Sequence, residues 1–458
     1  MTQKNSDSAV DPIVKKFGKM ESAAQPKWLA PRRKAGLASF AELGFPTLHD
    51  EDWRFTNVAP IEKLNFQLAK EISVNGAETK LIDESVFAKL SGHRLVFVNG
   101  FFSAKLSSIK PVAGGVRIEN LAAALTSGAS ILPAQNRPEA CSTIEKHLGK
   151  YAHTAGNTFA ALNQAFFTDG AFIFVPQGVT VAEPVQLIYI SSAKNSGETI
   201  LPRNLVIVEA NSKLTVVESY ISTGNVAYFT NAVTEILAGD NAAVEHIKLQ
   251  DEAVDAFHIA TIAGEFGRAS NVTVHSFALG AKLSRTNIRA KLAGEGLECI
   301  LNGLYLTKDE QLADHHMIVE HAQPNCASHE YFNGILDDKS KGVFHGRIYV
   351  HSIAQKTDAK QTNKNLLLSD DATADTKPQL EIYADDVKCT HGATIGQLND
   401  ESIFYLRARG IGRENARRML IHAFAGEIIE RVKCAPVREE LDKIVWNRLE
   451  ANHHLAEK

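Results

Sequence analysis

The chain has 458 residues, of which 44% are hydrophobic and 22% charged, and its formal net charge is −4. This length allows two or three domains with a large core, and the near balance of acidic and basic residues argues against binding to nucleic acid or to a membrane surface. The five scattered cysteines do not suggest a disulfide framework, so we expect free thiols in a reducing compartment, the cytoplasm.

The first 25 residues are polar and charged and are predicted to form a flexible tail. They contain no apolar segment typical of a secretory signal, and Asp7 and Asp11 argue against a transit peptide. No apolar run in the chain approaches the length needed to span a bilayer. We therefore expect no association with a membrane.

Residues 26–168 are predicted to form a mixed α/β domain. Helical patterns cover residues 26–44, 120–125 and 153–167, and a strand pattern covers residues 94–98. Trp53 lies in a dense aromatic and charged segment, residues 51–57, which we interpret as an anchor for this small domain.

Residues 169–397 are predicted to consist of short strands, with turn signals roughly every 8–12 residues between them. No stretch between residues 170 and 395 shows a ten-residue helical period. The predicted strands cover residues 171–175, 185–190, 205–208, 214–217, 272–277, 286–292, 343–350 and 379–384.

A chain built of so many short strands must protect the edges of its sheets. A barrel, a propeller, packed sandwiches or a β-helix can do so. The absence of a blade-sized repeat disfavours a propeller, and a β-helix tolerates irregular turns because each rung contacts only its neighbours. The strand pattern alone leaves the β-helix and the sandwich equally open.

Residues 398–458 are predicted to be helical and to dock a partner. Asn399 can cap the first helix, which Gly410 ends, and a third helix follows Pro436. Between them, one face of the segment 414–432 is apolar: Ala416, Leu420, Ala423, Phe424 and Ile428. Such a stripe either folds back on the β body or docks a partner, with Phe424 and Ile428 as anchors if it faces outward.

Motifs of common enzymes are missing. No Gly-x-x-x-x-Gly-Lys-[Ser/Thr] segment occurs, so the chain should not hydrolyse ATP. No Gly-x-Ser-x-Gly or His-Glu-x-x-His segment occurs either. We expect no catalytic residues and a protein that is not an enzyme.

Cys389 and His391 are the candidate metal ligands. They are two positions apart, so on an extended strand both side chains lie on the same face. Thiolate and imidazole suit zinc and iron–sulfur chemistry. Two ligands are too few for a closed site, so the others must come from elsewhere, such as another chain. The alternative is a buried cysteine beside a capping histidine.

The direction of this face depends on the regularity of the strand. If the strand that begins at Gln379 continues without interruption, Leu380 points inward and Cys389 and His391 point outward. A bulge at Asp385-Asp386 would reverse this direction.

Histidines are also frequent between Asp314 and His329, and further ones occur at His345 and His351. His315 and His316 would face opposite sides of a strand, and the spacing matches no common zinc pattern. We interpret these histidines as structural, hydrogen-bonded residues.

Three segments, residues 341–350, 359–369 and 385–410, resemble the SufB/SufD core family of the SUF iron–sulfur cluster assembly system. The resemblance extends roughly over residues 170–432. Within the family, Cys-Thr-His-Gly-Ala-Thr (389–394), Phe-Tyr-Leu-Arg (404–407) and the N-terminal segment 51–57 are similar to the SufD branch. SufB typically has a cysteine where this chain has Leu406.

This resemblance implies a right-handed parallel β-helix core, flanked by the N-terminal α/β domain and the C-terminal helices. It further implies a scaffold that works in a complex with a SufB-like scaffold and a SufC-like ABC-type ATPase. Cys389 and His391 would contact iron or a nascent cluster transiently in that complex, and the isolated chain would hold no stable cofactor.

Three alternatives remain at this point. A SufB-type scaffold that carries the cluster itself is disfavoured by Leu406. A β-helix carbohydrate-active enzyme would use paired carboxylates and usually secretion, and neither is evident. A zinc hydrolase built on residues 315–329 is the third.

Overall fold

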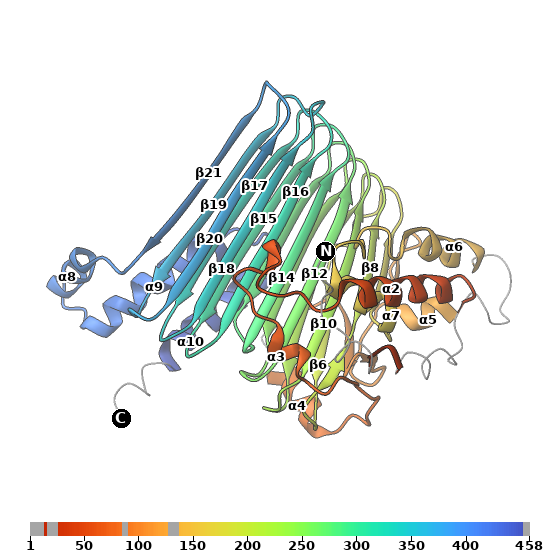
Figure 1. Cartoon of the computed structure of the whole chain (residues 1–458), viewed down its shortest axis with the longest axis horizontal. Helices are drawn as coiled ribbons and strands as arrows, with labels where there is room; N and C mark the ends of the chain where they lie inside the picture. The colour runs from red at the N-terminus through yellow and green to blue at the C-terminus, as the bar shows by residue number, and fades with distance from the viewer. Residues whose placement is uncertain (1–12, 16–25, 85–89, 127–136, 452–458) are drawn as a thin grey trace.

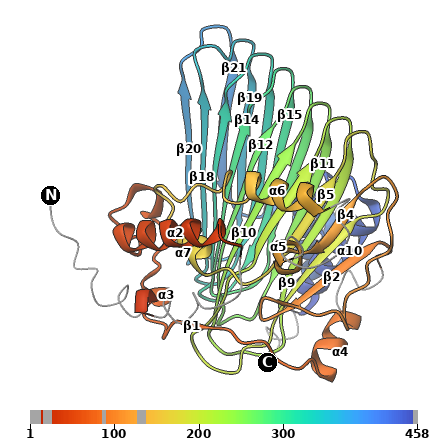
Figure 2. The ribbon, with the colours of Figure 1, turned by 90° about the vertical axis from the view of Figure 1, so that its right-hand side faces the viewer.

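The computed structural model describes residues 13–15, 26–84, 90–126 and 137–451. The tail predicted for residues 1–25 therefore lies outside the described residues, apart from 13–15. Two β-sheets face each other over most of the molecule, and helices lie on their outer sides (Figures 1 and 2). Among the described residues, no helix is both long and apolar enough to cross a membrane.

From β8 onward, the strands of the two sheets alternate along the chain, and each pairs in parallel with the strand two places further on; β5 and β6 pair in the same way with β8 and β9. This topology is a parallel β-helix with two strands in each turn, and it confirms the expected fold over the sandwich. The first sheet contains β5 (Ala171–Val175), β8 (Arg203–Val208), β10 (Phe229–Ala238), β12 (Phe257–Phe266), β14 (Leu283–Leu292), β16 (Leu312–His321), β18 (Lys341–Val350) and β20 (Thr373–Ile382). The second sheet contains β6 (Val185–Ser191), β9 (Lys213–Ser222), β11 (Ala243–Asp251), β13 (Asn271–Ala278), β15 (Glu298–Thr307), β17 (Ala327–Leu336), β19 (Asp358–Leu367) and β21 (Lys388–Gly396).

The connections from the first sheet to the second repeat one backbone feature. Each of the six connections between β8 and β19 contains one residue with positive φ. These residues are Asn211, Asn241, Ala269, Gly296, Asn325 and Lys356. Asparagine and glycine tolerate this left-handed conformation best, but alanine and lysine occupy two of the places. The sequence therefore carries no uniform signature of the repeat.

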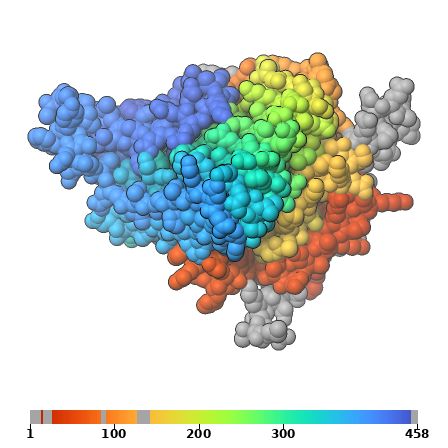
Figure 3. Space-filling view, turned by 90° about the horizontal axis from the view of Figure 1, so that it is seen from above, coloured from red at the N-terminus to blue at the C-terminus, as the bar shows by residue number. Residues whose placement is uncertain are grey.

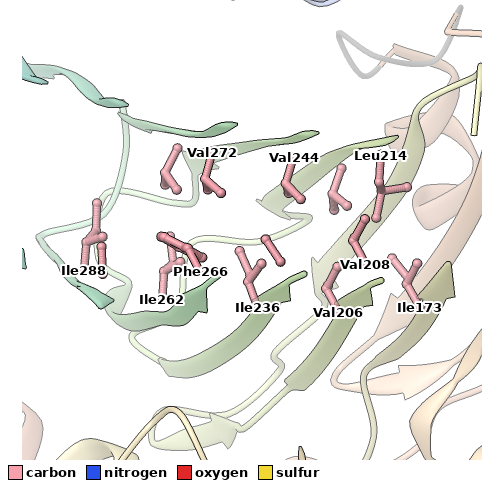
Figure 4. Packing of buried hydrophobic residues seen from close by; sticks show 14 of the residues in the cluster. Ile173, Val206, Val208, Leu214, Ile236, Val244, Ile262, Phe266, Val272 and Ile288 are labelled. Carbon is pink, nitrogen blue, oxygen red and sulfur yellow. The ribbon is translucent and has the colours of Figure 1, made fainter. Parts of the chain in front are cut away.

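Aliphatic side chains from both sheets fill the space between them. Figure 4 shows Leu214, Val244 and Val272 of the second sheet facing Ile236 and Ile262 of the first. All five are buried, and shortening one of them to alanine is expected to cost about 2–5 kcal/mol. This core holds the early turns of the β-helix together.

The N-terminal segment covers the outer face of the first sheet and also extends both sheets. Helices α2 (Leu29–Leu43) and α7 (Thr158–Phe166) bury Phe40 and Phe159 against Phe229 and Ile259 of the sheet. The other elements of this segment are η1 (Glu51–Trp53), α3 (Ala59–Glu62), α4 (Gly76–Glu84), α5 (Leu121–Thr126), α6 (Arg137–His147), β1 (Gln67–Leu68), β2 (His93–Val98), β3 (Phe101–Phe102) and β4 (Arg117–Asn120). Strand β1 pairs with the short strand β7 (Glu198–Ile200), which lies between β6 and β8 in the chain. Strand β2 pairs with β6 and β4 with β5, so the two sheets continue into the N-terminal region.

The C-terminal helices are α8 (Asp400–Ala408), α9 (Arg413–Ile429) and α10 (Ala435–Ala451). Helices α9 and α10 fold back and pack on the outer face of the second sheet, where Ile428 contacts the cluster that includes Leu304 and Ile335. Of the two alternatives for this stripe, the structure therefore shows the one in which it folds back on the β body, so Phe424 and Ile428 are not outward-facing anchors for a partner. Seen from above, these helices (blue) lie on one side of the molecule and the first part of the N-terminal region (red) on the other (Figure 3).

Candidate functional site

The last turn of the β-helix, β20 and β21, is unlike the turns before it. Each of these strands is the terminal member of its sheet, so one edge of each has no strand partner among the described residues. Strands such as β13 are almost fully buried, whereas eight of the nine residues of β21 are exposed. Ile395 on β21 is 49% exposed although it belongs to the side of the strand that faces the interior. No described segment therefore caps the β-helix at this end (Figure 1).

Both predicted ligands, Cys389 and His391, lie on β21. Cys389 pairs in register with Ala359, and His391 with Gln361. Ala359 and Gln361 are buried between the sheets, so the ligands share the inward face. The prediction that Cys389 and His391 point outward is therefore wrong, because the strand that contains Gln379, β20, ends at Ile382 and a turn leads into the other sheet. That turn brings about the reversal that a bulge would have produced.

The two ligands differ in their surroundings. Cys389 is half-buried and packs against Ile348, Val350 and Ala359, and this burial raises the pKa of its thiol. His391, two residues further, is exposed. A protonated thiol must release its proton when a metal binds. The pair can therefore offer one thiolate and one imidazole to an ion that approaches the open end.

On the neighbouring strands of the second sheet, the residues paired in register with Cys389 and His391 form two columns of inward-facing side chains. Behind Cys389 lie Ala359, Ser328 and Cys299, and behind His391 lie Gln361, Glu330 and Leu301. Neither Glu330 nor Gln361 was predicted from the sequence as a residue of this site. Their spacing of about 30 residues from each other and from His391 was the available signal, since it is the length of one turn of the β-helix.

Glu330 is a fully buried acid close to the open end. Burial raises its pKa to about 7, and its hydrogen-bond partner among the described residues is Gln361, whose Nε2 donates to Oε2 over 2.8 Å. The opposite sheet makes room for the pair with Gly346. A Cβ at that position would lie 2.0 Å from Nε2 of Gln361 and 3.0 Å from Oε2 of Glu330. The space for these two side chains is therefore built by both sheets.

Most histidines at the other predicted positions are hydrogen-bonded, as expected, but Nδ1 of His329 is buried without a hydrogen-bond partner among the described residues. His315 faces the interior, 2.9 Å from Oγ of Ser276, and burial lowers its pKa to about 3. His316 faces outward on the same strand. His345 and His351 bond to Gln379 and Glu320, both over 2.8 Å.

Asp52, His316 and His345 form a group whose candidate ligand atoms lie within 4.8 Å of one another. Nη2 of Arg285 lies 2.9 Å from Nδ1 of His316. A guanidinium only donates, so Nδ1 accepts and the ring hydrogen is on Nε2, the atom that faces Asp52. Oε1 of Gln379 likewise accepts a hydrogen from Nε2 of His345. The two histidines are thus held by hydrogen bonds to Arg285 and Gln379, and Oδ1 of Asp52 lies 3.6 Å from Nε2 of His316. The group joins the N-terminal segment to the sheet, and it does not support the zinc hydrolase alternative.

Two family models match this chain. One is described as "SUF system FeS cluster assembly, SufBD core domain" and covers residues 189–424, and the other, "SufBD protein N-terminal region", covers residues 15–187. An iron–sulfur cluster assembly SufBD family protein of Synechocystis is 33% identical over 97% of both chains. The iron–sulfur cluster assembly protein SufD of Escherichia coli is 32% identical over 92% of this chain and 93% of its own length. The protein ABCI7 of Arabidopsis thaliana, described as chloroplastic, is 29% identical over 89% of this chain and 83% of its own length.

Proposed function

This chain belongs to the SufBD family and has a scaffold role in SUF iron–sulfur cluster assembly, and from that premise we propose that it works as a SufD-like, non-catalytic subunit of a cytoplasmic complex. Its cargo is iron or a nascent cluster, which Cys389 and His391 bind at the open end of the β-helix. One observation carries the proposal: the register places the thiol and the imidazole on the same inward face of the last, uncapped strand.

The partner that completes the site is a SufB-like scaffold. The edges of β20 and β21 offer backbone donors and acceptors with no strand partner among the described residues, and such edges bind further strands readily. Ile395 and Tyr383 (60% exposed) add apolar surface beside these edges. A second β-helix docked here would enclose Cys389 and His391 and could add its own ligands to theirs.

The energy source is a separate SufC-like ATPase that docks on α8. This helix has no buried residue, and it displays Phe404 (72% exposed) and Tyr405 (58% exposed). It projects from the end of the molecule near β21 (Figure 1). An exposed aromatic pair on an unburied helix fits an interaction surface. The ATPase contact is therefore assigned to α8 and not to the apolar stripe of α9, which faces the second sheet.

Co-purification with the SufB-like and SufC-like partners, followed by loading with iron and sulfide, tests the function. We expect the isolated chain to purify almost free of metal and to lack ATP turnover, and we expect the complex to take up iron and sulfide. His391→Ala and Cys389→Ala should reduce that uptake while the complex still forms. Normal uptake in the double variant, or ATP hydrolysis by the pure chain, would contradict the proposal.

A further inference from the structure

The orientation of one buried amide side chain bears on how His391 could bind iron. Nε2 of Gln361 donates to Glu330, and Oε1 of Gln361 is buried without a hydrogen-bond partner among the described residues. Glu330 lies on β17, on the inner side of Gln361, and His391 lies on β21, on the other side. With Nε2 held on the β17 side, Oε1 remains as the acceptor available to β21.

His391 is the next side chain in the same column. Neighbouring strands of a sheet are about 4.8 Å apart, which is within reach of a hydrogen bond between long side chains. The imidazole is exposed in the single chain. When a partner covers the last turn, the ring becomes enclosed, and its N–H then requires an acceptor.

We propose that Gln361, oriented by Glu330, is a positioning residue for His391: Oε1 accepts the N–H of one ring nitrogen and leaves the lone pair of the other for iron. The inference rests on the proposed function, since it takes His391 as a ligand of the cargo. Histidines that bind metals almost always donate their other N–H in this way, which sets the tautomer and the direction of the ring.

Several features of the site support a role beyond filling space. A buried polar side chain normally satisfies its acceptor, yet Oε1 of Gln361 has no partner within the described parts of the single chain. Gly346 keeps the space for the Gln361 amide open, and any larger residue there would meet Nε2 at 2.0 Å. An apolar residue at position 361 would fill a β-helix interior without these requirements.

The test uses the full complex with its SufB-like and SufC-like partners and compares Gln361→Leu and Gln361→Met with the wild-type chain. Both variants keep the size of the side chain and remove the strong acceptor. We expect the iron concentration for half-maximal loading to rise about 10–100-fold. We also expect the nitrogen hyperfine coupling of ¹⁵N-labelled histidine to the reduced cluster, measured by electron–nuclear double resonance, to change or disappear.

Two further variants separate this effect from a loss of packing. Gln250 is a matched control, because it is also fully buried and donates to a buried acid, Glu252, over 3.2 Å far from the last turn. Gln250→Leu should leave both iron loading and the hyperfine coupling unchanged. The exchange variant Glu330→Gln/Gln361→Glu keeps the hydrogen-bonded pair and an acceptor at position 361, so it should restore loading and coupling.

The outcomes distinguish the two proposals. The positioning role would be overturned if a position-361 variant that enters the complex shows wild-type loading and coupling. If His391→Ala loses loading at the same time, the proposed function stays intact. Wild-type loading in His391→Ala would overturn both. Reduced loading in Gln250→Leu to the same extent as in the position-361 variants would show a general packing effect and overturn the positioning role.

Discussion

The closed turns of the β-helix and its last turn use the same strand geometry but expose their inward faces very differently. His246 on β11 and His391 on β21 occupy the same inward column of the second sheet. His246 is fully buried and bonds to Glu218 over 2.8 Å, whereas His391 is exposed. A further turn covers the first histidine, and none among the described residues covers the second. The comparison shows that the position along the stack, and not the strand itself, decides whether an inward histidine supports the core or is available to bind.

Alanine at each of these two histidines gives the largest expected contrast. His246→Ala leaves the buried Glu218 carboxylate without one of its hydrogen-bond partners, so we expect a loss of about 3 kcal/mol in the free energy of unfolding. His391→Ala, at an exposed position, should change that free energy by less than about 0.5 kcal/mol. Chemical denaturation measures both. Equal losses in the two variants would show that the last turn is as closed as the others.

The pH dependence of stability tests whether water reaches the buried Glu330 from the open end of the β-helix. Its pKa is raised to about 7 in the folded chain from 4.5, so the folded state retains a proton that the unfolded state has lost. The free energy of unfolding should therefore fall as the pH rises from about 4.5 to 7, by at most about 3 kcal/mol.

The contribution of Glu330 is isolated by comparison with Glu330→Gln, which cannot titrate. The difference in unfolding free energy between variant and wild type should shift in favour of the variant between pH 5 and pH 8. A difference that stays constant with pH would mean that water reaches this acid from the open end.

The edge of the last turn should be sensitive to charge on its inward face. Ile395→Asp would bury a carboxylate when the SufB-like partner docks, so we expect at least a tenfold weaker complex, about 1.4 kcal/mol. Thr394→Asp, on the outward face of the same strand, is the control and should weaken binding less. Titration calorimetry or sedimentation measures both affinities. Equal affinities of the Ile395→Asp and wild-type chains would place the interface elsewhere.

The smallest expected effect compares an exposed and a half-buried phenylalanine of the C-terminal helices. Phe404→Ala on α8 should weaken binding of the SufC-like ATPase by about 1–2 kcal/mol and leave the fold stable. Phe424→Asp on α9 places a charge at a residue that packs against the outer face of the second sheet, so it should lower stability instead. Circular dichroism and a binding assay separate the two effects. Unchanged ATPase binding in Phe404→Ala would contradict docking on α8.

Local patterns in the sequence predicted much of the secondary structure. Asn399 caps α8, where its side chain accepts from the backbone N–H groups of Glu401 and Ser402, and Gly410 has positive φ after that helix. The segment 286–292 was predicted as a strand and lies within β14, where its alternate apolar residues Ile288, Ala290 and Leu292 are buried in the core. These signals depend on residues close in sequence, so they can be detected without knowledge of the fold. The choice of a β-helix, by contrast, came from the family resemblance and not from the strand pattern.

Other features depended on residues far apart in the sequence. Strand β10, for example, was not predicted, because inward-facing polar residues such as Thr234 interrupt its apolar pattern and are satisfied by bonds to other turns, here to Glu218. The domain boundaries at residues 168 and 397 remain a prediction, although strands β2 and β4 extend the sheets across the first of them.

For the candidate site, the sequence by itself determined the chemistry: a thiol and an imidazole two residues apart, on one face of a strand and too few to hold a metal alone. Only the tertiary structure decided that this face points inward, since the turn after Ile382 moves the chain into the other sheet. It also placed Glu330 and Gln361 behind His391. The alternation of residues within one strand does not reveal these neighbours, because they lie on the preceding turns of the β-helix, about 30 positions away for each turn.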